Sequence, residues 1–209
     1  MFANFLSAKI IKPFFTEIDH NLRFLTEHYP SAYRIDRTRG ANPISQPLEN
    51  LNFAGSLYGP IIYQKAPIVM RHLETRIGAE QLRQGLVQYL ERYSFGNASW
   101  TDLIEILAED SGQNLKIWNH DWVEQAGLPI ISVSRTDRGV ELIQKDPLEK
   151  DRTWEQSLTV TYGMMKEGKI STSSQIINMI KKTHKIDDPG DIDFVIPNGS
   201  GFEYGQFLL

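Results

Sequence analysis

The side chain of this sequence best suited to chemistry is a tyrosine near the start of a predicted helix. Tyr63 follows Pro60, a favoured first residue of a helix, and apolar residues recur at steps of three and four from Ile62 to Ile77. Tyr63 falls on the edge of that stripe, so its ring can lie in the core while its hydroxyl faces a cleft. A core tyrosine with a satisfied hydroxyl is the simpler interpretation of the residue type alone.

Metal-ligating residues are sparse and poorly spaced. The chain has five histidines and no cysteine, and no two histidines are four residues apart, so no helix presents a pair of imidazoles: His20, His28, His72, His120 and His184. Four carboxylates between Asp187 and Asp193 could attract calcium, but they lack the spacing of a calcium-binding loop, and a hydrated turn explains them more simply. We therefore expect no metal ligands in this chain.

Composition limits the remaining classes of function. The 209 residues, 41% hydrophobic and 23% charged, suffice for one large domain or two small ones. A net charge of −4 argues against a nucleic-acid surface, and the absence of an apolar run near twenty residues predicts no membrane span. Localisation is unknown from sequence; the absence of cysteine slightly favours a cytoplasmic protein.

The elements that must position Tyr63 are helical. Periodicity predicts helices over residues 2–12, 15–28, 60–77, 79–93, 101–109 and 114–125. Ile18, Leu22 and Leu25 form the predicted stripe of the second helix, and Ser99 is the predicted N-cap of the fifth. The segment from Pro30 to Tyr58 is rich in proline and glycine and has no period, which predicts a long connection without secondary structure.

The hydrophobic period changes to that of strands after Gly127-Leu128-Pro129. Apolar residues on either side of Thr136–Gly139 indicate a hairpin, and further strand segments follow around residues 158–162, 175–180, 193–198 and 204–209. The fold class is therefore α plus β, and the second part is expected to be a small antiparallel β-sandwich. The predicted domains are residues 1–127, helical, and residues 128–209, the sandwich.

Four motifs occur in one order over about half the chain. They are Tyr63-Gln64-Lys65-Ala66, Gly78-Ala79-Glu80 through Gly85-Leu86 to Tyr89, Asn97-Ala98 through Asp102-Leu103, and Trp122 through Gln125-Ala126-Gly127 to Pro129. Together they resemble the zinc aminopeptidase family of aminopeptidase N and the tricorn-interacting factors, the gluzincin metallopeptidases. The resemblance implies the helical C-terminal part of a thermolysin-like catalytic domain, followed by that family's β-domain.

The resemblance also implies roles for two residues. The motif tyrosine, Tyr63, would be catalytic and would stabilise the oxyanion formed when zinc-activated water attacks the first peptide bond. Tyr58 aligns with an aromatic residue near the substrate cleft in some family members and would bind substrate, although packing within its loop explains it equally well. Zinc would be the cofactor of the intact parent, with a peptide as substrate and the other domains of the polypeptide as partners.

This sequence departs from the family at several positions. The family's His-Glu-x-x-His motif and third-ligand glutamate are absent, and Met1 to Lys12 resembles the helix that follows that glutamate, so we expect a fragment that lacks the zinc ligands and is inactive alone. Asn42-Pro43-Ile44 replaces His-Pro-Ile. Lys65-Ala66-Pro67 replaces Lys-Gly-Ala, and Pro67 removes the hydrogen bond to the Tyr63 carbonyl, which predicts a kink or a loosened turn.

A second interpretation belongs to another class of protein. A degenerate family member without a competent zinc site, serving as a non-catalytic interaction or scaffold module, would have the same residues over this stretch. Upstream sequence containing His-Glu-x-x-His, followed by a glutamate, would distinguish the enzyme from the scaffold.

Overall fold

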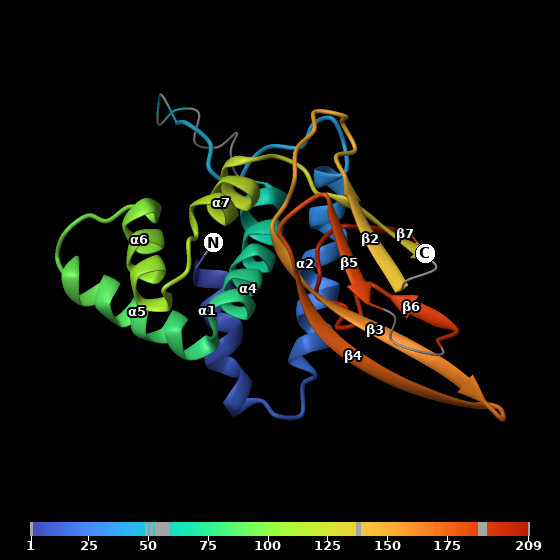
Figure 1. The fold of residues 1–209 in the computed structure, drawn as a ribbon. Helices are drawn as coiled ribbons and strands as arrows, with labels where there is room; N and C mark the ends of the chain where they lie inside the picture. The colour runs from blue at the N-terminus through green and yellow to red at the C-terminus, as the bar shows by residue number, and fades with distance from the viewer. Residues whose placement is uncertain are drawn as a thin grey trace. The chain divides into compact units, whose positions relative to one another are not determined.

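The computed structural model describes residues 2–48, 50, 52, 59–136, 139–187 and 192–208. Contacts divide the chain into two compact units (Figure 1). The first comprises Met1–Tyr33 and Asn42–Ala126, and the second Arg34–Ala41 and Gly127–Leu209. The described part of the first unit contains helices, and that of the second contains strands, which confirms the predicted change from helix to strand near Pro129.

The helical unit is built around α4. Its helical elements are α1 (Phe2–Ile11), η1 (Lys12–Phe14), α2 (His20–Asp36, whose last three residues group with the second unit), η3 (Ile61–Lys65), α4 (Ala66–Ile77), α5 (Ala79–Arg92), α6 (Trp100–Ser111), α7 (Lys116–Asn119) and η4 (His120–Glu124). Helix α4 packs on α1, α5 and η4, and α5 packs on α6.

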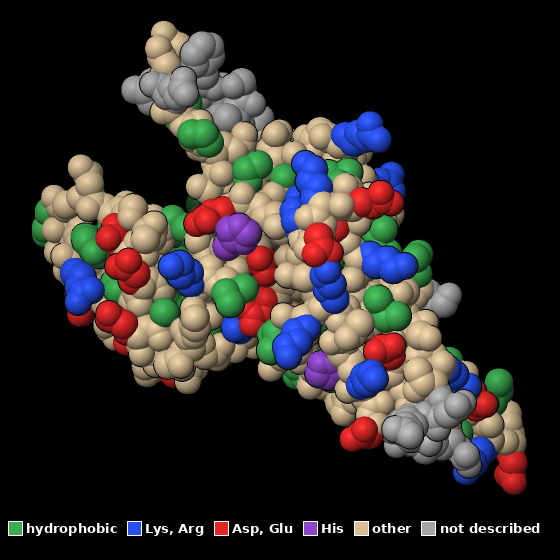
Figure 2. Space-filling view, turned by 45° about the horizontal axis from the view of Figure 1, so that its top comes forward, with side chains coloured by type: hydrophobic (Ala, Val, Ile, Leu, Met, Phe, Trp, Pro, Cys, Tyr) green, Lys and Arg blue, Asp and Glu red, His purple; other side chains and the backbone are tan. Residues whose placement is uncertain are grey.

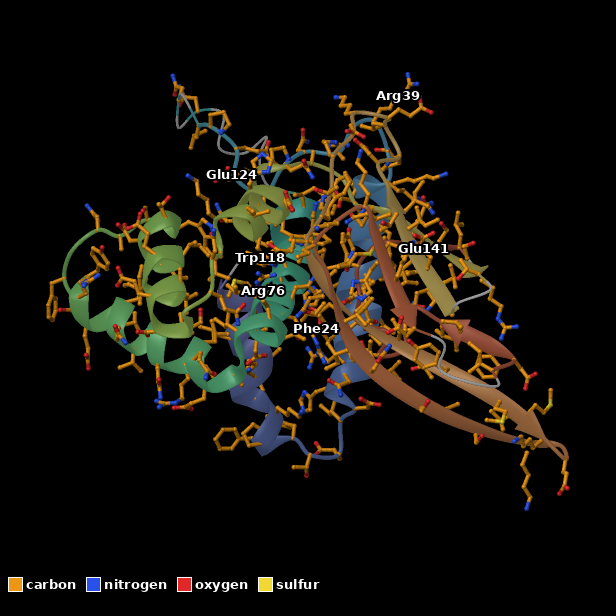
Figure 3. The ribbon with its side chains drawn as sticks, in the orientation of Figure 1. Phe24, Arg39, Arg76, Trp118, Glu124 and Glu141 are labelled. Carbon is orange, nitrogen blue, oxygen red and sulfur yellow. The ribbon has the colours of Figure 1, made fainter. Side chains whose placement is uncertain are left out.

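The apolar stripe of α4 forms the core of this unit, as predicted. Val69, Met70 and Leu73 are fully buried, and Ile77 is 5% exposed. Trp118 is also buried, with 1% of the residue exposed (Figure 3). Burying one large aliphatic side chain contributes roughly 1.5–3 kcal/mol, so this stripe holds α4 in place despite the proline near its start.

The structure corrects the predicted second helix. Helix α2 begins at His20 rather than Phe15 and continues through Pro30 to Asp36, so residues 30–36 are not part of a loop. The buried residues in its first part are Phe24 and His28, whereas Ile18 and Leu22 of the predicted stripe are exposed. Burial continues at helical spacing beyond the proline, and this packing outweighs the hydrogen bond that Pro30 cannot donate.

Helix α6 starts as its sequence predicts. The Ser99 hydroxyl accepts a hydrogen bond from the Asp102 N–H, and the Asp102 side chain accepts one from the Ser99 N–H, which completes a capping box. The Ser99 hydroxyl also donates to the Asp102 carboxylate at 2.6 Å, and this hydrogen bond, together with the one from the Ser99 N–H, lowers the pKa of Asp102. At the other end Gly112 adopts a left-handed conformation with φ of 65°. Helix α6 therefore has a defined first and last residue.

The described part of the second unit contains two small β-sheets. Its strands are β1 (Ile130–Thr136), β2 (Gly139–Lys145), β3 (Gln156–Lys166), β4 (Lys169–Met179), β5 (Thr183–Asp187), β6 (Phe194–Ile196) and β7 (Gln206–Leu208). The strand orders are β5-β2-β1-β7 in one sheet and β4-β3-β6 in the other. Apolar residues of both sheets share one core, among them Leu142, Leu158 and Val160. The predicted β1–β2 hairpin is confirmed, with Thr136 opposite Gly139.

One strand pair differs from the expected antiparallel pattern. Strand β7 pairs with β1 in parallel, with Ile130 opposite Gln206. The chain just before β7 is anchored, because Tyr204 is fully buried and the Glu203 carboxylate accepts a hydrogen bond from the Thr159 N–H. Gln206 then donates its N–H to the Pro129 carbonyl, and this contact starts β7 alongside the first residue of β1.

The last turn of α2 and the residues that follow it group with the strands in this second unit. The segment Arg34–Ala41 groups with it, and the Asp36 carboxylate accepts a hydrogen bond from the Gly127 N–H at 3.1 Å. Gly127 has a φ of 91°, which favours glycine. The assignment of domains to residues 1–127 and 128–209 stays a prediction.

Two general features of the described residues are the distribution of surface charge and the length of the helices. Acidic and basic side chains are interspersed over the visible face of each unit (Figure 2). In the part of the chain that the structure describes, no helix has the length and apolar character needed to span a membrane.

Candidate functional site

The turn that bears Tyr63 is a π-helix rather than an α-helix. Residues Ile61–Lys65 form this π-helix, η3, and the Ala66 N–H closes it by donating to the Ile61 carbonyl, five residues back. Pro67 follows as the second residue of α4. The loosened turn predicted from Pro67 is confirmed, and such single π-turns often occur at functional sites.

Tyr63 lies partly in solvent. Its side chain is 44% exposed, whereas Ile61 and Lys65 on either side of it are buried. Its N–H donates to the Gly59 carbonyl at 3.1 Å, which fixes the start of the turn. A half-exposed phenol on a turn anchored at both ends can present its hydroxyl to a ligand, which a fully buried tyrosine could not do.

A side chain of α1 holds the backbone of this tyrosine. The Asn4 amide donates a hydrogen bond from Nδ2 to the Tyr63 carbonyl at 3.3 Å. That carbonyl would normally receive the N–H of residue 67 in an α-helix, and proline has none. Asn4 therefore replaces the hydrogen bond that Pro67 removes.

A side chain of α2 holds the next residue. His28 contacts the Gln64 Oε1 through its Nδ1 at 2.6 Å, and because that oxygen is an acceptor, Nδ1 is the donor. His28 is 3% exposed, and its ring packs edge-on against Phe24 with the centroids 4.5 Å apart. The Arg71 guanidinium covers the Phe24 ring at 5.3 Å, and burial lowers the pKa of Arg71. His28 is thus fixed by its surroundings.

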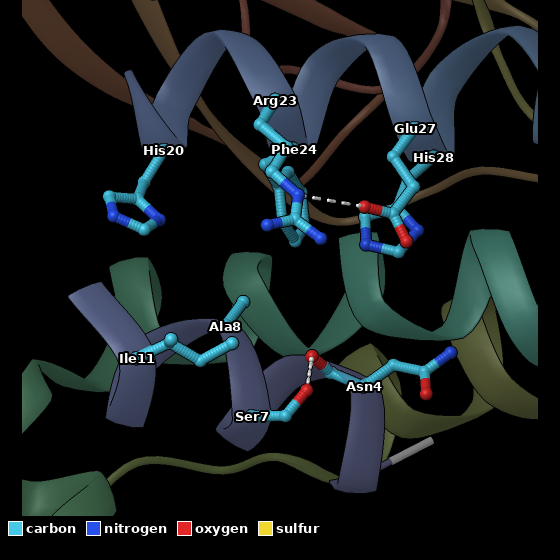
Figure 4. Close-up of a pocket in the computed structure, with 9 residues that line it drawn as sticks. All are labelled: Asn4, Ser7, Ala8, Ile11, His20, Arg23, Phe24, Glu27 and His28. Carbon is cyan, nitrogen blue, oxygen red and sulfur yellow. Dashed lines mark hydrogen bonds and ion pairs between the residues drawn. The ribbon is translucent and has the colours of Figure 1, made fainter. Parts of the chain in front are cut away.

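A small pocket lies between α1 and α2 beside these contacts (Figure 4). Its volume is about 120 Å³, and Asn4 and His28, the residues that contact the Tyr63–Gln64 turn, are both in its lining. Arg23 and Glu27, one turn apart on α2, pair at its rim at 3.5 Å, where both side chains are about half exposed. A space of this size holds a few water molecules or a small polar group.

Neither the second predicted site residue, Tyr58, nor a metal site is found among the described residues. Tyr58, the predicted substrate-binding residue, lies outside the described residues. Within the described ranges, no three histidine, aspartate or glutamate side chains lie together in a way that could hold a metal ion. The residues present do not form a zinc site, so no catalytic step can be assigned to a metal bound by them.

Comparison with known proteins identifies the family. The model of the peptidase family M1 domain matches residues 1–122, more than half of the chain. This chain belongs to peptidase family M1. The match runs from α1 into η4, and so includes the Tyr63 turn and both residues that hold it.

Relatives in this family are aminopeptidases or are named for tricorn protease. The chain is 27% identical to tricorn protease-interacting factor F2 of Thermoplasma volcanium over 81% of its own length, and 30% identical to aminopeptidase M1-A of Oryza sativa over 68%. It is 27% identical to the alanine/arginine aminopeptidase of Saccharomyces cerevisiae over 72%. The chain spans only 22%, 16% and 18% of these three relatives' lengths, so the activity of the whole protein is a matter for proposal.

Sequence reasoning missed Asn4, His28 and Gln64. Nothing in their spacing marks them, because Asn4 is 59 residues from Tyr63, and His28 is 36 from Gln64. The one available signal was Pro67, which leaves a carbonyl in need of a donor. Pro67 shows which carbonyl requires another hydrogen-bond donor, but it does not identify the residue that supplies the donor.

Proposed function

We propose that this chain is part of a zinc-dependent aminopeptidase that hydrolyses N-terminal residues from peptides. Membership of peptidase family M1 supports the reaction class, and the half-exposed position of Tyr63 on an anchored π-turn supports its role. The peptide would be the substrate, and Tyr58 would line its binding site. Residues outside this chain would hold the zinc, so the chain would be inactive alone.

The step assigned to this chain is electrostatic. When water attacks the carbonyl of the first peptide bond, negative charge develops on the carbonyl oxygen, and the Tyr63 hydroxyl donates a hydrogen bond to it. A donor held in place before the reaction stabilises the transition state more than the substrate.

Replacing Tyr63 by phenylalanine tests this role in the polypeptide that contains the zinc-binding residues. Loss of one oxyanion donor should lower kcat roughly 10²- to 10³-fold with little change in KM, because the lost interaction exists only in the transition state. Steady-state hydrolysis of an aminoacyl amide measures both constants.

Tyr89→Phe is the matched control. Tyr89 donates its hydroxyl to the Ser99 carbonyl at 3.3 Å on the surface of the same unit. Its loss should cost one hydrogen bond of about 1 kcal/mol in stability and leave turnover unchanged. A Tyr63→Phe enzyme that keeps most of its kcat would end the assignment.

A further inference from the structure

The orientation of Tyr63 depends on more than its own helix. In η3 the Ala66 N–H bonds the Ile61 carbonyl five residues back, and π-turns of this kind are rare and often occur at functional sites. Pro67 then denies the Tyr63 carbonyl its usual partner. The backbone at Tyr63 is therefore less constrained by local bonds than a residue inside α4.

Two side chains from other helices supply the missing constraint. Asn4 binds the Tyr63 carbonyl, and His28 binds the Gln64 side chain at 2.6 Å. The two contacts are of different strength, since the contact from Asn4 is longer, at 3.3 Å, and Asn4 is only partly buried. His28 is the stiffer of the two, because Phe24 packs against its ring and only 3% of the residue is exposed.

We infer that His28 and Asn4 are positioning residues that aim the Tyr63 hydroxyl. His28 acts through Gln64, and Asn4 acts through the Tyr63 carbonyl. Neither side chain touches the substrate in this mechanism. The inference rests on the proposed function, because the direction of the Tyr63 hydroxyl matters only if that hydroxyl stabilises the oxyanion.

The magnitude follows from how steeply catalysis depends on geometry. A displacement of about 1 Å can cost roughly 10²-fold in rate, so a partial loosening of the turn should lower kcat by roughly tenfold or more. KM should stay within about twofold, because a donor that acts in the transition state adds little to substrate binding. A purely structural role would change stability without this division between kcat and KM.

The experiment is a double-mutant cycle in the polypeptide that contains the zinc-binding residues. His28→Phe removes the donor and keeps an aromatic ring, and His28→Asn retains a donor near the position of Nδ1. We expect His28→Phe to lower kcat roughly tenfold or more and His28→Asn to restore most of the loss. In a Tyr63→Phe background, His28→Phe should have no further effect, because there is no hydroxyl left to aim.

Controls separate positioning from folding. His20→Phe changes the same residue type on the same helix and in the same pocket, where the imidazole contacts the Phe15 carbonyl at 2.7 Å and not the Tyr63 turn, so kcat should be unchanged. Asn4→Leu should act like His28→Phe, whereas Ser7→Ala, one turn further along α1, should be neutral. The Ser7 hydroxyl donates a hydrogen bond to the Asn4 carbonyl at 3.0 Å, within α1 and away from the Tyr63 carbonyl that the Asn4 amide binds.

The outcomes are distinguishable. If Tyr63→Phe lowers kcat but His28→Phe lowers it equally in both backgrounds, or His28→Asn fails to restore activity while folding normally, the positioning role is overturned and the proposed function stands. If Tyr63→Phe leaves kcat intact, the proposed function fails and the positioning role fails with it.

Discussion

The loop between β2 and β3 offers the sharpest test of stability. Its centre is the Asp146 carboxylate, which receives both Nε and an Nη of Arg152 at 2.8 Å. The Leu148 and Lys150 N–H groups also donate to it, at 2.9 and 3.0 Å. The Asp146 side chain is 2% exposed and that of Arg152 is 18% exposed. The loop is thus folded around one buried negative charge.

Replacing Asp146 by asparagine removes the charge and places an NH₂ group against donors. Removing one partner of a buried ion pair typically costs about 3–5 kcal/mol. Arg152 keeps some contact with water and stacks on Trp154 at 5.0 Å, which lowers the cost, while asparagine still accepts at one oxygen. We expect Asp146→Asn to destabilise the second unit by about 2 to 4 kcal/mol at neutral pH.

The effect should depend on pH in one direction. The hydrogen bonds from Arg152 hold the pKa of Asp146 well below its ordinary value of 3.8. The folded state therefore stays ionised while the unfolded chain takes up a proton, so the stabilisation is complete above the unfolded pKa and declines as pH falls below it. The difference between wild type and Asp146→Asn should be about 1 kcal/mol smaller at about pH 3 than at neutral pH.

Hydrogen exchange of peptides from β2 and β3, followed through a urea titration, measures this unit separately from the helical one. Asp151→Asn is the control, because Asp151 pairs with Lys182 at the surface and its side chain is 81% exposed. Exposed pairs are worth about 0–1 kcal/mol, so this variant should stay close to wild type. An Asp146→Asn protein within about 0.5 kcal/mol of wild type would refute the reasoning.

Two further changes test the helical elements. Ser99→Ala removes the N-cap of α6 and should cost about 1 kcal/mol, measured by hydrogen exchange in α6, with no effect expected there from Ser94→Ala outside the cap. Pro30→Ala should stabilise α2, because Pro30 is exposed and a helix-interior proline costs about 3 kcal/mol relative to alanine, offset by up to about 1 kcal/mol of unfolded-chain entropy. Slower exchange of the α2 amides would support this, and faster exchange would show that Pro30 is needed where it stands.

The elements that sequence reasoning predicted well are those whose signals are local. The stripe of α4 repeats at helical spacing, the Ser99 capping box lies within four residues, and β1 and β2, which pair with each other, are neighbours in sequence. Each of these features is determined by residues close together in sequence. Local agreement of this kind makes a prediction reliable because no distant contact is needed to decide it.

The elements that sequence reasoning missed depend on distant packing. Pro30 predicts the end of a helix, yet α2 continues because Tyr29 and Ala32 are buried on either side of it. Strand β7 has only three residues, and its parallel direction follows from the burial of Tyr204 next to it. No pattern in the sequence predicts the continuation of α2 or the direction of β7, because tertiary burial can outweigh the local helix or strand propensity.

The candidate site combines both kinds of information. The motif around Tyr63 and the weakness introduced by Pro67 are readable in the sequence, so a loosened turn could be predicted. Its π geometry and the identities of Asn4 and His28 could not, because these contacts join residues 59 and 36 positions apart. A proline that removes one backbone bond creates a need for a donor, and the fold can meet that need from whichever helix lies beside the turn. The hydrogen bonds from Asn4 and His28 therefore compensate for the backbone hydrogen bond that Pro67 removes, and the three residues act together on the Tyr63 turn.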